Sequence, residues 1–144
     1  MNFWLIKSEP DVWSWDMQVA KGDEGEAWTG VRNHTAKLNL IKMRKGDRAF
    51  FYHSNIGLEI VGIVEVIGEA RPEPGDETGK WSCVDVKAVC DVSKPVPLTT
   101  VKATPDLASM SLVTCMRLSV QPVTPQEWAL VCRMGGVDTR KIGT

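Results

Sequence analysis

Polar and aromatic side chains gather in three short clusters of the sequence. The clusters are Lys7-Ser8-Glu9-Pro10, Trp28-Thr29-Gly30-Val31-Arg32-Asn33 and Tyr52-His53-Ser54-Asn55. A pocket for a flat heterocycle requires an aromatic face together with a few directed hydrogen-bond donors and acceptors. The three clusters supply these groups at strand ends and in adjoining loops. They are therefore the candidate functional site.

The residue types in these clusters are suited to the recognition of a nucleobase. Trp28 offers a face on which a base can stack. Neutral hydroxyl and amide groups, which suit the edge of a base, come from Ser8, Asn33, Ser54 and Asn55. Arg32 and Lys37 are cations that would hold a flanking phosphate.

Several residues of these clusters also have a purely structural interpretation. Trp28 would plug its loop against the core, and Ser8 and Asn55 would form hydrogen bonds within their own turns. His53 would be a hydrogen-bonded histidine within a strand. We expect the remaining tryptophans to serve packing, namely Trp4, Trp13, Trp15, Trp81 and Trp128.

Several common chemistries are excluded or unsupported by the motifs. Glycine-rich phosphate loops and the Gly-x-Ser-x-Gly nucleophile motif do not occur. The four cysteines at positions 83, 90, 115 and 132 form no Cys-x-x-Cys pair and lie far in sequence from both histidines, so no metal site is supported. We expect free structural thiols, no catalytic residue, no metal and no cofactor.

The length, composition and net charge of the chain are typical of one globular domain. The chain has 144 residues, 43% hydrophobic and 24% charged, with a net charge of −1, so we predict a single domain over residues 1–144. No apolar run approaches the ~18 residues of a membrane span, and the N-terminus lacks the features of a signal peptide. We expect a monomer without a membrane partner, located in the cytoplasm or, in a bacterium, at the nucleoid. Residues 31–48 contain six basic side chains against one acid, which indicates a local basic patch.

Hydrophobic periodicity predicts the elements that must position the clusters. Strands are expected at 2–7, 48–54, 59–67, 82–92 and 116–123, and loops at 21–30 and 70–80. Short helical turns are expected over 99–111, after a break at Pro95-Val96-Pro97-Leu98.

Three helices have recognisable start signals. Ser14 caps a short helix on which Trp15 and Val19 would share a face. A helix over 33–44, capped by Asn33 or Thr35, would bury one apolar face, and a last helix begins with the capping box of Thr124 and Glu127. The predicted fold is a small α+β domain, a curved mixed sheet or partial β-barrel flanked by helices.

The three clusters, taken as whole motifs, closely resemble the EVE domain, a member of the PUA-like superfamily that is related to YTH domains. The first motif is Phe3-Trp4-Leu5-Ile6-Lys7-Ser8-Glu9-Pro10, the second is the Trp28 cluster, and the third is Phe50-Phe51-Tyr52-His53-Ser54-Asn55. Weaker matches in later segments, such as Arg117-Leu118-Ser119-Val120, extend the resemblance over essentially the whole chain.

This resemblance implies a non-catalytic reader of modified nucleobases, most often modified cytosine in DNA. The partner would be DNA or RNA that carries such a base, flipped into the pocket. By motif, the pocket would contain Ser8, Trp28, Asn33, Ser54 and Asn55, and its rim Lys7, Arg32 and His53. The chain has a short loop at 70–80 and carries His34 where many relatives carry tyrosine.

Two alternatives stay open at this point. Related PUA-like proteins of the ASCH type include amidohydrolases of acylated nucleosides, and Lys7 and Glu9 would then act as cation and base. This requires the first strand to continue past Ser8. A plain RNA-binding module is the other alternative.

Overall fold

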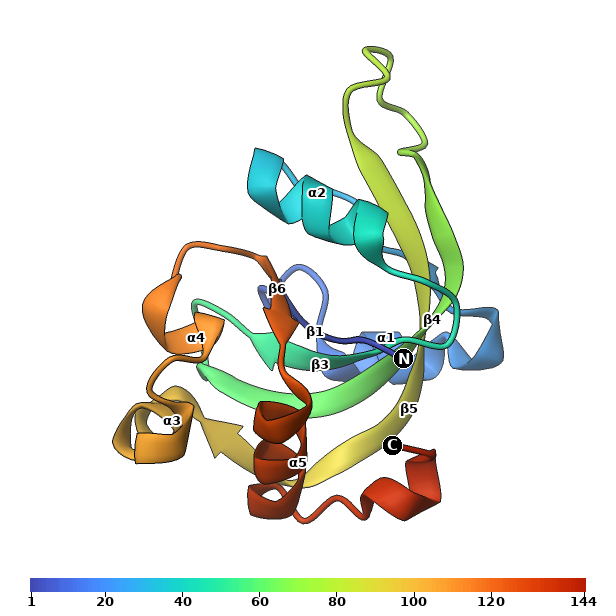
Figure 1. Ribbon diagram of the computed structural model, residues 1–144. Coiled ribbons are helices and arrows are strands. Elements are labelled where there is room, and N and C mark those ends of the chain that lie inside the picture. Colours follow the sequence, from blue (N-terminus) through green and yellow to red (C-terminus); the bar gives the residue numbers. More distant parts are fainter.

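One mixed sheet of six strands organises the molecule, and helices pack on both of its faces (Figure 1). The computed structural model describes residues 1–144, and the strand order is β2-β5-β4-β3-β1-β6. The strands are β1 (Phe3–Ser8), β2 (Glu26–Ala27), β3 (Arg48–His53), β4 (Glu59–Pro72), β5 (Ser82–Pro97) and β6 (Val120–Val123). Only β1 and β3 run parallel. The predicted α+β class with a curved mixed sheet is confirmed.

Strand alternation divides the core into two apolar layers. Leu5 and Phe50 point into one layer, whereas Ile6 and Phe51 point into the other, as the two-residue period of a strand requires. The first layer packs under α3 (Leu98–Ala103), α4 (Ser111–Thr114) and α5 (Pro125–Met134), and the second under α1 (Trp15–Ala20) and α2 (His34–Lys42). Three short 3₁₀ turns complete the structure, at Gly22–Glu24, Pro105–Leu107 and Thr139–Ile142.

The helix start signals are confirmed. The side chains of Ser14, Asn33 and Thr124 accept hydrogen bonds from the backbone of their own first turns. Trp15 and Val19 line the same surface cavity, as their shared helix face predicts, but Val19 is exposed and Gln18 is the residue buried with Trp15. Gln18 is satisfied there, since it accepts from Trp13 Nε1 and donates to the carbonyl of Val86.

The β4–β5 hairpin is longer than the sequence pattern predicts. β4 continues to Pro72, and β5 continues through the expected break to Pro97. Proline lacks the N–H that a strand ladder uses, so it is tolerated at strand ends and bulges. Pro72 and Pro97 occupy the ends, and Pro95 lies in an irregular stretch where the register shifts. The hairpin extends beyond the rest of the sheet as a consequence (Figure 1).

No helix has the length and apolar character that a membrane span requires. No group of three histidine, cysteine or acidic side chains is arranged to hold a metal ion. All four cysteines are free thiols. Cys83 and Cys132 are buried, Cys90 is half-buried and Cys115 is exposed.

A hydrogen bond to His53 joins the end of β3 to the start of α1. The Trp15 backbone N–H donates to His53 Nε2 over 3.1 Å, so this nitrogen carries no proton in the bonded state. Burial lowers the pKa of the His53 imidazole, and the nearby carboxylates of Glu59 and Asp16 partly oppose that shift. His53 is thus a hydrogen-bonded structural histidine.

The depressed pKa of His53 gives stability a defined pH dependence. Above about pH 6.5, the ordinary histidine pKa, both folded and unfolded states hold neutral imidazole and this contribution is complete. As pH falls through that value, only the unfolded chain takes up the proton, so the free energy of unfolding decreases. Chemical denaturation at a series of pH values between about 8 and 5 measures this decline.

A matched pair of variants assigns the decline to this residue. His53→Gln keeps an acceptor that does not titrate, so we expect its stability to lose most of the dependence near pH 6.5. His34→Gln replaces the other, exposed histidine and is expected to behave like the parent protein. The same decline in all three proteins would show that His53 is not responsible.

Candidate functional site

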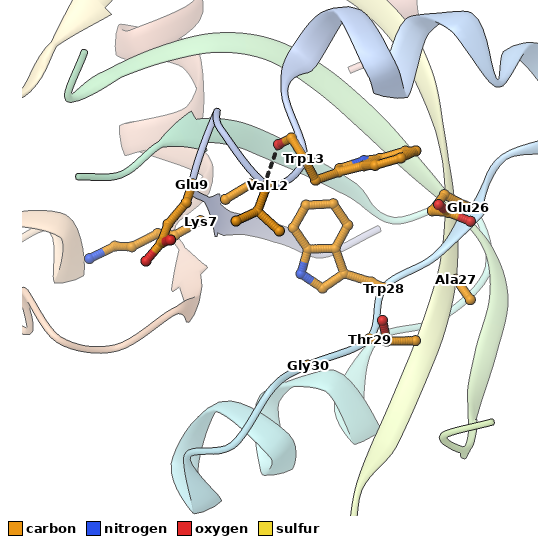
Figure 2. A pocket seen from close by; sticks show the side chains of 10 residues that line it. Lys7, Glu9, Val12, Trp13, Glu26, Ala27, Trp28, Thr29 and Gly30 are labelled. Atoms are coloured by element: carbon orange, nitrogen blue, oxygen red, sulfur yellow. Dashed lines mark hydrogen bonds between the residues drawn. The ribbon is translucent and has the colours of Figure 1, made fainter. Parts of the chain in front are cut away.

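A cavity of about 360 Å³ opens where β1 ends (Figure 2). This volume falls within the ~300–1,000 Å³ of typical small-ligand sites. One wall is the end of β1 with the segment that follows it, and the other is β2 with the segment that follows it. The lining residues are Lys7, Ser8, Glu9, Val12, Trp13, Glu26, Ala27, Trp28, Thr29 and Gly30.

Trp28 is one of two tryptophans that line the cavity and is firmly positioned. Its backbone N–H donates to the carbonyl of Val84 on β5 over 2.7 Å. Its ring packs against Phe51, with centroids 5.5 Å apart and an interplanar angle of 82°. Only 7% of the residue is exposed, so the ring is anchored in the core on one side and reaches the cavity on the other.

The indole N–H of Trp28 has no acceptor in the protein. Those of Trp4, Trp13, Trp15 and Trp128 each donate to a protein oxygen. A largely buried tryptophan N–H usually finds a partner. Figure 2 shows the nitrogen of Trp28 on the ring edge that faces away from Trp13. The cavity therefore presents a free donor beside an aromatic face.

Ser8 lines the cavity and holds one of its walls. Its buried hydroxyl donates to the backbone carbonyl of Trp13 (Figure 2), and its own carbonyl accepts from Ser54 N–H over 2.9 Å. Because a hydroxyl has one proton and two lone pairs, Ser8 Oγ keeps an acceptor position free. Ser8 thus fixes the wall at Val12 and Trp13 and can still accept a hydrogen bond.

Three charged side chains line the cavity, and Lys7 marks its rim. Lys7 Nζ donates to the carbonyl of Met116 and lies 5.7 Å from the centroid of the Tyr52 ring. Burial lowers the pKa of the Lys7 ammonium, while nearby Cys115 partly opposes that shift. Glu9 and Glu26 add carboxylates to the lining. The charged lining therefore consists of two carboxylates, which accept hydrogen bonds, and one ammonium group.

Three of the five residues predicted for the pocket lie outside its lining. Asn33 accepts from Ala36 N–H as the cap of α2 and lines a second cavity instead. Ser54 and Asn55 form the turn after β3, where Asn55 adopts a left-handed φ of 71° that asparagine tolerates well. Ser8 and Trp28 are the two that meet in the cavity.

Arg32 belongs to a contact between the Trp28 segment and the β4–β5 hairpin. Its guanidinium binds both carboxylate oxygens of Glu73, at 3.1 and 2.6 Å, and lies 5.3 Å from the centroid of Trp81. The buried Glu73 also accepts from Gly30 N–H over 2.6 Å. The Glu73 pKa is lowered chiefly by the hydrogen bond from Arg32. Arg32 therefore holds the cavity wall.

Lys37 and His53 also lie outside the cavity lining. Lys37 is half-buried on α2 and has no ion-pair partner. His53 lines a different cavity, together with Glu59 and Asp91. Lys7 is the only predicted rim residue that lines the site.

The sequence interpretation missed Val12 and Trp13 as a cavity wall and Glu73 as its brace. The sequence predicts a packing role for Trp13, and nothing in the local pattern indicates that its carbonyl reaches back to Ser8. The one available signal is Pro10, which ends β1 and turns the chain so that Val12 and Trp13 N–H groups both donate to Glu9. Glu73 is 41 residues from Arg32, beyond the range of any local pattern.

Comparison with known proteins gives relatives over nearly the whole chain. Mouse thymocyte nuclear protein 1 is 33% identical over 90% of this chain and 72% of its own length. A Rhodopseudomonas palustris protein solved by NMR is 64% identical, with a TM-score of 0.90 over 94% of each chain. Human THYN1 protein, crystallised in complex with DNA containing 5-methylcytosine, is 31% identical, with a TM-score of 0.87 over 96% of this chain and 99% of that chain.

The fold likeness extends further than the sequence likeness. A YTH domain of Zygosaccharomyces rouxii, solved with N6-methyladenosine RNA, superposes with a TM-score of 0.57 at 17% identity, over 93% of this chain and 86% of that chain. This likeness concerns the fold alone. The family model of the EVE domain matches residues 2–134. The chain therefore belongs to the EVE domain family.

Proposed function

We propose that this protein binds nucleic acid and reads a modified base, with modified cytosine in DNA as the target, in the cavity beside Trp28. The observation that carries the proposal is the unpartnered Trp28 indole N–H at an anchored aromatic face. The human THYN1 protein, which was crystallised with 5-methylcytosine DNA, is similar over almost all of the chain. This similarity supports the same ligand class here.

The bound base is flipped out of its strand and stacks on Trp28. Flipping a base out of a duplex costs a few kcal/mol, and less from a single strand. Stacking on an aromatic side chain returns ~1–3 kcal/mol. These two contributions nearly cancel for a duplex, so we expect tighter binding to single-stranded or mismatched DNA.

Cytosine suits the groups that remain free in the cavity. Its exocyclic amine is a donor, which matches the acceptor positions of Ser8 Oγ and of the lining carboxylates. The Trp28 indole N–H lies in the plane of its ring, so it is free to donate to a sugar or phosphate oxygen of the strand beside the stacked base. A methyl group adds only ~0.8 kcal/mol when buried, which is about fourfold in affinity. Methylation alone therefore gives modest discrimination.

Replacing Trp28 tests the stacking role. Trp28→Ala is expected to weaken binding of a methylcytosine oligonucleotide by about 5- to 150-fold, which corresponds to the loss of ~1–3 kcal/mol. Because this truncation also costs ~3–5 kcal/mol of core packing, folding of the variant is checked by circular dichroism. Trp28→Phe keeps a ring against Phe51 and loses the N–H, so we expect intermediate affinity. Parental affinity in a folded Trp28→Ala protein would remove Trp28 from the site.

Matched oligonucleotides test the ligand class. We expect single-stranded DNA with 5-methylcytosine to bind about fourfold more tightly than the unmodified strand, by fluorescence anisotropy. RNA of the same sequence serves as the comparison. Equal binding of modified and unmodified RNA, in preference to the methylated DNA, would indicate a plain RNA-binding module instead.

Hydrolysis of a modified nucleoside is the competing function, because Lys7 and Glu9 both line the cavity. β1 ends at Ser8, however, so the strand geometry that would align them does not continue. Lys7 Nζ is also engaged by the Met116 carbonyl. Incubation with an N-acylated cytidine, followed by mass spectrometry, is expected to return the nucleoside unchanged. Release of free cytidine would favour the enzyme.

A further inference from the structure

A second cavity, of about 500 Å³, lies next to the first. Its walls are the start of α2, at Asn33 and Thr35, and the segment 113–118. The two cavities meet at Lys7, which lines the first one and donates from Nζ to the carbonyl of Met116 in the second. A strand whose base enters the first cavity would therefore continue toward the second.

Uncompensated positive charge distinguishes the second cavity. Arg117 is exposed and takes part in none of the five ion pairs of the structure, and its guanidinium donates no hydrogen bond within the protein. The lining contains no aspartate or glutamate. Lys7, at the shared rim, is likewise free of ion pairs. Two cations thus lie beside an acid-free cleft.

Neutral donors in the cleft complete an environment that suits an oxyanion. α2 begins at His34, and its cap Asn33 satisfies Ala36 N–H, so the N–H groups of His34 and Thr35 have no partner within the helix. The Thr35 side chain also lines the cleft. The planar fork of arginine matches the geometry of phosphate oxygens. Phosphate is the ligand chemistry that fits this combination.

We propose that this cleft binds the phosphodiester group next to the base held at Trp28, with Arg117 and Lys7 as its cations. This inference rests on the proposed function. It adds the direction in which the nucleic-acid strand continues from the bound base, which the base cavity alone does not define. It also replaces Arg32 as the phosphate ligand expected from the sequence, since Arg32 is committed to Glu73.

The salt dependence of binding tests the assignment. Arg117→Ala is compared with Arg133→Ala, which removes the same charge from an exposed, unpaired arginine on α5. Each lost phosphate contact reduces the slope of log affinity against log salt by ~0.7 for a single strand. We expect this reduction, with weaker oligonucleotide binding, for Arg117→Ala and the parental slope for Arg133→Ala.

A ligand without phosphate separates this inference from the proposed function. Free 5-methyl-2′-deoxycytidine, titrated by NMR, is expected to bind Arg117→Ala and the parent protein equally. An unchanged salt slope in Arg117→Ala would overturn the phosphate cleft while leaving the base cavity in place. A parent protein that binds neither the nucleoside nor the methylated oligonucleotide would overturn both.

Discussion

The parallel pairing of β1 with β3 is the constraint on which the site depends. Its register brings Ser8 beside His53, so both strands end at the same edge of the sheet. Ser8 then forms two hydrogen bonds to different segments. Its carbonyl accepts from Ser54 N–H, and its hydroxyl donates to the carbonyl of Trp13. His53 accepts from the Trp15 backbone. The segment that forms one cavity wall is therefore fixed at both of its ends by the ends of two central strands.

The opposite wall is held by a separate set of contacts. Trp28 is anchored by its backbone on β5 and by its ring on Phe51, and Glu73 joins Gly30 and Arg32 to the start of the loop between β4 and β5. Neither wall relies on a ligand for its position. Preorganisation of this kind lowers the entropic cost of binding, which matters when stacking and base flipping are of similar magnitude.

Local signals predicted the framework better than the site. The caps at Asn33 and Thr124 and the strands expected near residues 2–7 and 48–54 depend on short-range signals, and they are confirmed. Asn33 shows the limit of such local signals. The sequence predicts this side chain both as a helix cap and as a pocket residue, and in the structure its amide oxygen forms the cap. Trp13 and Glu73 depend on contacts that only the folded chain creates. The sequence predicts a break at the prolines of β5, whereas Pro95 lies where the register shifts and Pro97 ends the strand.

The indole N–H signals of the six tryptophans offer the most direct test of the Trp28 site. In a ¹⁵N-labelled protein, we predict that a methylcytosine oligonucleotide shifts the Trp28 Nε1–H signal most, since that donor gains an acceptor on binding. Trp4 and Trp128 already donate to Asp47 and Thr144 and are expected to stay unchanged. Saturating oligonucleotide that leaves the Trp28 signal in place, while it moves those of other tryptophans, would contradict the account.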